Sequence, residues 1–242
     1  MRRSAIALLV LSAACSAATN PVDRMPSELT QLPRPLSAAE KQVRTSGNAF
    51  AFSMLGRLAV AQRNENVFVS PVSASMALGM LLNGAAGNTA TEMRQALALG
   101  DAPMAEVNQG YHDLMQLLRE LDPGVELRIA NGIWADAALP VNQSFLDAAK
   151  QYFEADARTV RFSDPATIAA INAWVSQHTN GRIKTIMDDA TGDEVMVLAN
   201  AIYFKGAWRK RFDAGQTTDA PFRGADGTSR TVKMMKVPAG SF

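Results

Sequence analysis

Cysteine and histidine are scarce in this sequence, which removes several classes of catalytic and metal site. The 242 residues include one cysteine, Cys15, and two histidines, His112 and His178. A zinc site needs several such ligands at short spacing, and neither a cysteine–histidine cluster nor an HExxH motif occurs. Both histidines fall on expected helices and are interpreted as surface or helix-end residues. Because the only cysteine lies in a leader-like segment, the body has no disulfide and depends on core packing for its stability.

Aromatic residues are also few, and neither sign of charge dominates. Aromatic side chains make up 7% of the sequence, hydrophobic residues 48% and charged residues 19%, with a net charge of +1. Removal of a leader that contains Arg2 and Arg3 would lower the net charge to −1. Neither value favours nucleic acid or an anionic membrane as the main partner. The basic triplet at 209–211 is interpreted as a solvated face, and the composition is typical of a soluble globular protein.

Catalytic motifs are missing as well. No GxSxG elbow occurs, and the glycine-containing segment "GMLLNGAAGNT" lacks the lysine of a phosphate-binding loop. The carboxylates are scattered, and no two of them stand out as an acid and a base. We therefore expect no enzyme, no cofactor and no metal site.

The first residues have the pattern of an export signal. "MRRSAIALLVLSAACSAATN" has a basic start, an apolar stretch over 5–11 and then small residues. Two processing routes are open. "LSAAC" resembles a bacterial lipoprotein signal, which would attach a lipid to Cys15, whereas an ordinary signal peptide would be cut after Ala14 or Ala18. Both routes predict an exported protein, extracellular or periplasmic, and the first adds a membrane anchor.

Three segments are expected along the chain. A signal peptide covers 1–18, a proline-rich tether covers 19–37, and a folded body begins at residue 38 and runs to 242. Helices dominate the first half of the body and strands gather later, which favours an α+β architecture. The expected helices lie near 38–62, 71–83, 89–99, 103–121, 142–153 and from 165, and the expected strands near 66–70, 125–136, 157–162 and 195–204, followed by a hairpin that turns at 224–227.

Helix-start signals support these boundaries. Ser70 is a plausible N-cap with Pro71 in the first turn, and Asp164 precedes another proline at a helix start. Thr89, followed three residues later by Glu92, has the pattern of a capping box.

An amide interrupts the most apolar strand. In "VMVLANAIYF", residues 195–204, apolar side chains fall on both parities, which is typical of a strand in the middle of a sheet. Asn200 then points into a packed layer, where an unpaired amide costs about 1–3 kcal/mol. We therefore expect partners for Asn200 elsewhere in the chain, or a strand end at this position.

Several blocks resemble the serpin family of serine protease inhibitors in its bacterial form. "NVFVSPVSASMALGMLLNGAAGNTATEM", "INAWVSQHTNGRIKTIM" and "LANAIYFKGAWRKRFDAGQTTDAPF" resemble serpin motifs, and "RIANGIWAD" and "VKMMKV" fit the same order. The resemblance covers most of residues 39–242. It implies the serpin fold, with N-terminal helices and a large central sheet that is antiparallel or mixed.

The resemblance also assigns roles to four residues. It implies that Ser70, Ser73 and Asn200 form the shutter, the polar cluster where the sheet parts to admit another strand. It places Trp208 in the breach, at the top of the opening. Alternatives for two of them are a plain helix cap at Ser70 and a hydrophobic plug at Trp208.

Serpin inhibition implies a suicide mechanism against a serine or cysteine protease, in which a cleaved reactive loop inserts into the central sheet. Relative to the family, the sequence ends at Phe242 before that loop, so no cleavage-site residue can be named. We expect a C-terminally truncated serpin domain that is inactive by itself, and a monomer if complete. The alternatives are a non-inhibitory serpin-fold binding protein and a nonfunctional gene remnant. Translating the DNA beyond codon 242 would distinguish a gene remnant from an incomplete reading of a longer gene.

Overall fold

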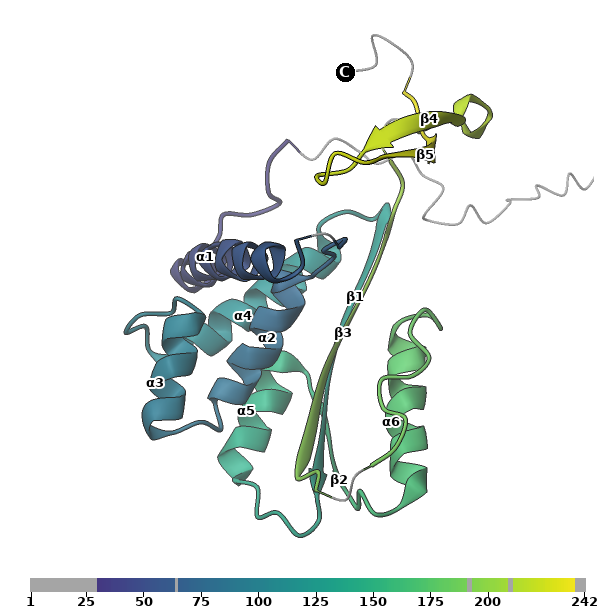
Figure 1. The fold of residues 1–242 in the computed structure, drawn as a ribbon. Coiled ribbons are helices and arrows are strands. Elements are labelled where there is room, and N and C mark those ends of the chain that lie inside the picture. The colour runs from purple at the N-terminus through teal and green to yellow at the C-terminus, as the bar shows by residue number, and fades with distance from the viewer. Residues whose placement is uncertain (1–29, 64, 191–192, 209–210, 238–242) are drawn as a thin grey trace, which may run out of the picture.

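The chain forms a helical layer and a small twisted sheet, with one further helix on the far side of the sheet (Figure 1). The computed structural model describes residues 30–63, 65–190, 193–208 and 211–237. The helices are α1 (Ala38–Ala61), α2 (Pro71–Leu82), α3 (Gly87–Ala96), α4 (Met104–Glu120), α5 (Gln143–Phe153), α6 (Pro165–His178) and the short 3-10 helix η2 (Ala214–Gln216). The strands are β1 (Val125–Asp136), β2 (Asp156–Val160), β3 (Met196–Gly206), β4 (Thr218–Arg223) and β5 (Ser229–Met234).

The main sheet is mixed, with strand order β2-β1-β3. β1 pairs in parallel with β2 and antiparallel with β3, and Asn131 on β1 lies directly opposite Asn200 on β3. β4 and β5 form a separate antiparallel hairpin beyond the upper end of β3 (Figure 1). Both the α+β class and the hairpin are confirmed.

Side-chain alternation along the strands fills two apolar layers. Successive strand residues point to opposite faces, so one face of β1 and β3 packs against α2, α4 and α5 and the other against α6. The first layer includes the buried residues Met76, Met80, Tyr111, Ile129, Ile133 and Phe153. The second includes Trp134, Ile168, Ile171, Trp174 and Ala201.

The position of β3 in the sheet differs from the prediction. Apolar residues on both parities predicted a central strand, but β3 is an edge strand within the described part of the chain, paired on one side with β1. Its two apolar faces are explained by helices on both sides of the sheet: α2 on one side, α6 on the other.

Local capping fixes most helix starts as predicted. Ser70 caps α2, Asn142 caps α5 and Asp164 caps α6, each accepting a hydrogen bond from a backbone N–H of the first turn. The capping box expected at Thr89 is wrong. α3 begins two residues earlier, at Gly87, whose φ of 57° turns the chain into the helix before Thr89 is reached.

The strand predicted over 66–70 is also absent from the structure. The segment has no regular hydrogen-bonding pattern, although its β-branched and aromatic residues favour a strand. A strand requires a partner, and no described residue pairs with this segment. Phe68 is 100% exposed as a result.

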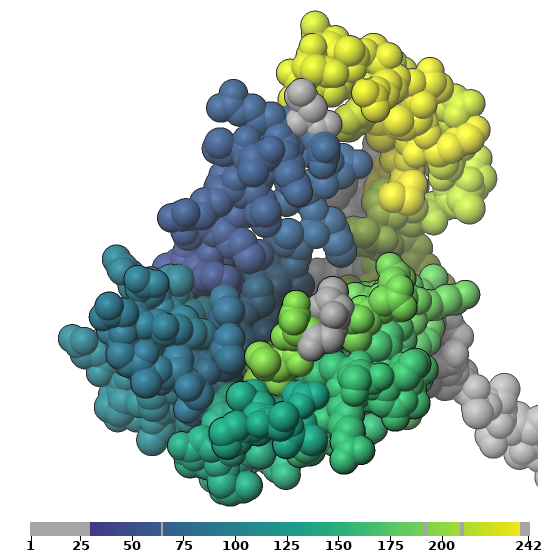
Figure 2. Space-filling view, turned by 60° about the horizontal axis from the view of Figure 1, so that its bottom comes forward, coloured from purple at the N-terminus to yellow at the C-terminus, as the bar shows by residue number. Residues whose placement is uncertain are grey.

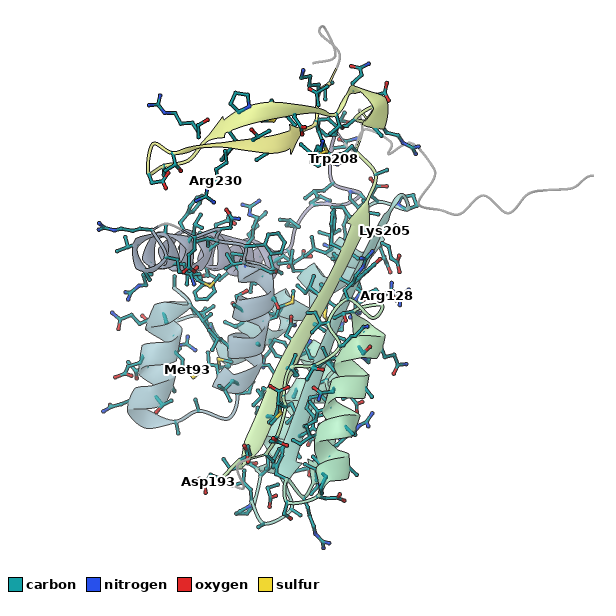
Figure 3. The ribbon with its side chains drawn as sticks, turned by 45° about the vertical axis from the view of Figure 1, so that its right-hand side comes forward. Met93, Arg128, Asp193, Lys205, Trp208 and Arg230 are labelled. Carbon is teal, nitrogen blue, oxygen red and sulfur yellow. The ribbon has the colours of Figure 1, made fainter. Side chains whose placement is uncertain are left out.

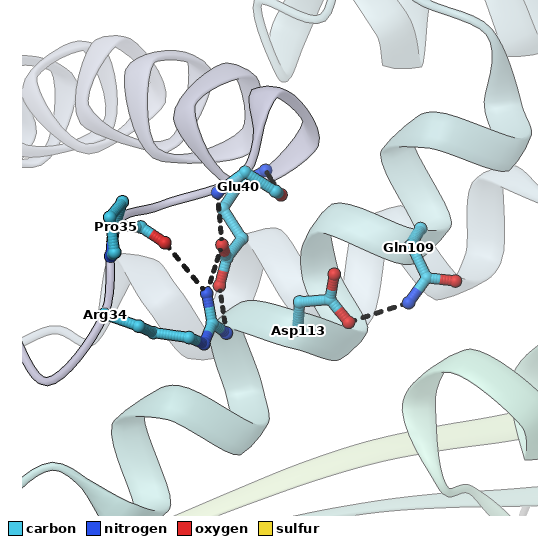
Figure 4. Close-up of polar contacts among 6 residues, drawn as sticks. Arg34, Pro35, Glu40, Gln109 and Asp113 are labelled. Atoms are coloured by element: carbon cyan, nitrogen blue, oxygen red, sulfur yellow. Dashed lines mark hydrogen bonds and ion pairs between the residues drawn. The ribbon is translucent and has the colours of Figure 1, made fainter.

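The first helix is anchored by an ion pair between an exposed arginine and a buried glutamate (Figure 4). Ser37 and Glu40 form a capping box at the start of α1, and the guanidinium of Arg34 donates to both carboxylate oxygens of Glu40, at 2.8 and 2.7 Å. These hydrogen bonds lower the pKa of Glu40 below its usual value, against the opposing effect of burial. The ionised form is therefore preferred in the folded chain.

A pH-dependent stability difference follows for Glu40→Gln. Because the folded pKa is lowered, ionised Glu40 stabilises the fold above its unfolded pKa of about 4.3, and this contribution is lost as the pH falls through the folded pKa. Urea unfolding should show Glu40→Gln to be less stable than wild type at pH 7, with the gap narrowing below pH 4. Glu106→Gln, at an exposed position in the first turn of α4, is the control. A stability difference between Glu40→Gln and wild type that does not change with pH, or an equal difference for Glu106→Gln, would contradict this account.

Candidate functional site

The half-buried amide of Asn200 on β3 has hydrogen-bond partners on two other elements, α2 and β1, and the hydrogen bonds continue from β1 to α5. The Ser73 hydroxyl, in the first turn of α2, donates to Asn200 Oδ1. Asn200 Nδ2 donates to Asn131 Oδ1 at 2.7 Å, and Asn131 Nδ2 donates to the carbonyl oxygen of Phe153 at 2.7 Å. We call Ser73, Asn200 and Asn131 the latch. It runs from α2 across both long strands to the last residue of α5.

The latch lies inside the layer between the sheet and the helices. Asn131 is 2% exposed, while Ser73 and Asn200 are half-buried. Ile129 and Ile133 flank Asn131 on the same face, so the amides interrupt an apolar surface. The Asn131 and Asn200 amides each donate one hydrogen bond and accept another. These bonds offset the free-energy cost of removing the two amides from water.

α2 is held against the helical layer by a close contact on its buried side. A Cβ atom added at Gly79 would lie 2.6 Å from the Tyr111 ring, so only glycine allows this approach. Burial raises the pKa of Tyr111 to about 12. The latch residues themselves do not titrate, so we expect the latch to be insensitive to pH.

The four residues predicted for the site have different positions. Ser73 and Asn200 meet, as described above. Ser70 is exposed, and its hydroxyl accepts from the Ser73 backbone N–H at 3.3 Å, so it acts as the cap that orients the first turn of α2. No hydrogen bond between Ser70 and Asn200 is present among the described residues.

Trp208 follows the upper end of β3 (Figure 3) and is 66% exposed. Its ring makes an edge-to-face contact with Phe212, with centroids 5.5 Å apart. The assignment of Trp208 to a breach therefore stays a prediction. Cys15 lies outside the described residues, as do the signal segment and part of the tether.

Asn131 belongs to the site but was not predicted from the sequence. It lies in "RIANGIWAD", where it interrupts the apolar residues on one face of β1 in the way that Asn200 interrupts β3. The same reasoning about a buried amide applies to it. The sequence pattern does not show the strand register that pairs Asn131 with Asn200, which lie 69 residues apart in the chain.

Other kinds of site find no support in the described residues. No group of three or more histidine, cysteine, aspartate or glutamate side chains is arranged to hold a metal ion there. Within the same residues, no helix combines the length and apolar character needed to cross a membrane.

Comparison with known proteins identifies the architecture. The profile of the family described as "Serpin (serine protease inhibitor)" matches residues 45–241. Corticosteroid-binding globulin from Saimiri sciureus is 37% identical over 199 residues, which cover 80% of this chain and 49% of that protein. Serpin A3-6 from Bos taurus is 34% identical over 194 residues, 79% of this chain and 47% of that protein.

Solved structures agree. Cleaved kallistatin complexed with heparin matches with a TM-score of 0.75 and 29% identity, over 81% of this chain and 58% of that one. Reactive-loop-cleaved human thyroxine-binding globulin matches with a TM-score of 0.74 and 32% identity, over 82% and 60%.

The chain spans about half the length of the curated relatives it matches. These relatives are named as a corticosteroid-binding globulin and a serpin. A family match over most of the chain, together with the shared fold, shows that this protein belongs to the serpin family.

Proposed function

We propose that the chain is part of an exported serpin-fold protein that binds its partner noncovalently, without inhibiting a protease. The observation that carries this proposal is the similarity to proteins named for ligand binding. Corticosteroid-binding globulins from several mammals are 34–37% identical over 77–80% of the chain. A thyroxine-binding globulin shares the fold at 32% identity.

In this proposal the latch keeps the sheet attached to α2. Ser73, Asn200 and Asn131 link α2, β3 and β1 through hydrogen bonds between side chains, which break when the strands shift relative to α2. Since buried hydrogen bonds are costly to leave unmade, the latch favours one sheet arrangement over others. A partner that prefers a different arrangement would have to compensate for the lost bonds.

Equilibrium dialysis of the 242-residue chain with a labelled corticosteroid and with labelled thyroxine tests the proposal. Saturable one-to-one binding of either compound is the expected result. The absence of saturable binding of both compounds would overturn the proposal.

Protease inhibition is the second candidate, favoured by the family description and by the similarity to serpin A3-6. In the described residues the outer edge of β3 has no partner strand, and that edge is where an inserted strand would pair. The expected targets are serine or cysteine proteases. For the 242-residue chain, which spans about half the length of its curated relatives, we expect no SDS-stable complex with any member of a protease panel.

The domain limits and the route of export also belong to this proposal. α1 begins at Ala38, which supports a folded body from residue 38 after a tether over 19–37. The leader over 1–18 supports export, with or without a lipid on Cys15. Mass spectrometry of the mature N-terminus distinguishes the two routes, because an unmodified start beyond Cys15 excludes the lipid anchor.

A further inference from the structure

A pocket lies at the lower end of the helical layer, away from the latch. The pocket has a volume of about 420 Å³ and is lined by the end of α2, the turn into α3, α3 itself, the loop before α5, the start of α5 and the first residue of β3. Figure 2 brings this end of the molecule forward, where the blue surface of α2 and α3 meets the teal surface of the β1–α5 loop. Met93 lies on α3 (Figure 3).

The lining is apolar and uncharged. None of its residues is acidic, basic or histidine, and most are aliphatic or aromatic, including Leu81, Met93, Val141, Phe145 and Met196. Removing apolar surface from contact with water is favourable, so an apolar ligand that displaces water from this pocket gains binding free energy. An ionised ligand would lose its hydration here without gaining a counter-charge.

The walls of the pocket are fixed by contacts behind them. The Phe145 ring lies against Gly84, where a Cβ atom would be only 3.1 Å from the ring, so the α2–α3 turn is seated on α5. The backbone N–H groups of Gly84 and Ala85 are bonded to the carbonyls of Leu81 and Leu82. The turn therefore presents apolar groups in a defined arrangement without an unpaired backbone donor at these two positions.

Two polar groups lie at the edge of the lining. Asn142 Oδ1 already accepts from the N–H and the hydroxyl of Ser144. The Thr89 hydroxyl makes no hydrogen bond within the part of the chain that the structure describes, so it is available to a ligand. One polar contact at the rim of an apolar pocket is the usual way in which a small ligand is oriented.

We propose that this pocket binds a small, uncharged, largely apolar compound that makes one hydrogen bond to Thr89. Leu81 lies in the last turn of α2, whose first turn carries Ser73, and Met196 begins the strand that carries Asn200. The ligand thus bridges α2 and β3, the same two elements that the latch joins, and stabilises their present arrangement. This proposal does not depend on steroid or thyroxine binding, because the ligand class follows from the lining alone.

The neutral fluorophore N-phenyl-1-naphthylamine is the probe for the 242-residue chain. In ¹³C-methyl-methionine NMR spectra, saturation with the probe should shift the methyl groups of Met93 and Met196 and leave that of Met235, on an exposed segment elsewhere, in place. Shifts confined to methionines outside the pocket, or no shift at all, would overturn the proposal. This measurement uses the unmodified chain, so it does not depend on a variant that folds.

A matched pair of variants on α3 tests the location by affinity. Thr89→Phe fills the pocket and should weaken probe binding at least tenfold, whereas Thr91→Phe, at an exposed position of the same helix outside the lining, should change it less than twofold. Equal effects of both substitutions would contradict the assignment. Failure of the dialysis experiment above leaves this result unaffected, so the two proposals are tested separately.

Discussion

Replacing Asn131 with leucine is expected to lower the free energy of unfolding by about 2–4 kcal/mol, although the leucine side chain has the same branched shape. Asn131 is 2% exposed and makes two side-chain hydrogen bonds, one to the Phe153 carbonyl and one from Asn200. Leucine leaves the Phe153 carbonyl oxygen and Asn200 Nδ2 in an apolar layer without these hydrogen-bond partners. Because the desolvation of these partners is then uncompensated, the loss exceeds the net value of an ordinary hydrogen bond.

Urea unfolding followed by circular dichroism measures this loss. Asn88→Leu, at an exposed position of α3, is the control and should change stability by less than about 0.5 kcal/mol. If Asn131→Leu leaves the free energy of unfolding unchanged or raises it, the amides are not required for the stability of the fold. The relay from α2 to α5 would then have no energetic role.

The second large effect is expected on the other face of the sheet. Trp134 is 1% exposed and meets Trp174 of α6 edge to face, with ring centroids 5.2 Å apart. Its ring also covers Gly132, where a Cβ atom would lie 2.4 Å from the indole. Trp134→Ala removes this contact between the sheet and α6 and should cost about 3–5 kcal/mol.

Trp134→Phe is the matched variant. Trp134 Nε1 is buried without a hydrogen-bond partner, so phenylalanine keeps an aromatic ring and removes an unsatisfied donor. Its loss of stability should be much smaller than that of alanine, about 1 kcal/mol or less. Similar losses for both substitutions in urea unfolding would contradict the packing account.

Much of the architecture could be predicted from local sequence. β1 has the expected limits, 125–136, because its apolar residues are bounded by turn signals, and α2 and α6 start at the expected caps, Ser70 and Asp164. Where a helix-start prediction is wrong, the cause is a local contact or backbone conformation that the sequence pattern does not show. Thr89 and Ser37 both have glutamate three residues later, but only Ser37 forms the box, because Gly87 starts α3 early and Arg34 holds Glu40 in place.

The candidate site was only partly predictable for a different reason. The need for a partner to Asn200 follows from burial, and the family resemblance supplied the α2 serines, of which Ser73 alone makes the contact. Asn131 depends on strand register, which is decided by packing across the whole layer. The pocket beside Met93 and Phe145 depends on how three separate segments meet, which no single motif encodes.

A double-mutant cycle on Ser73 and Asn200 tests the central claim, that a side-chain latch couples α2 to the sheet. Ser73→Ala, Asn200→Ala and the double variant should give a coupling energy of about 1 kcal/mol. The parallel cycle with Thr91→Ala should be additive, because Thr91 is exposed on α3 and does not contact Asn200. Additivity in the Ser73 cycle, or equal coupling in both cycles, would contradict the account.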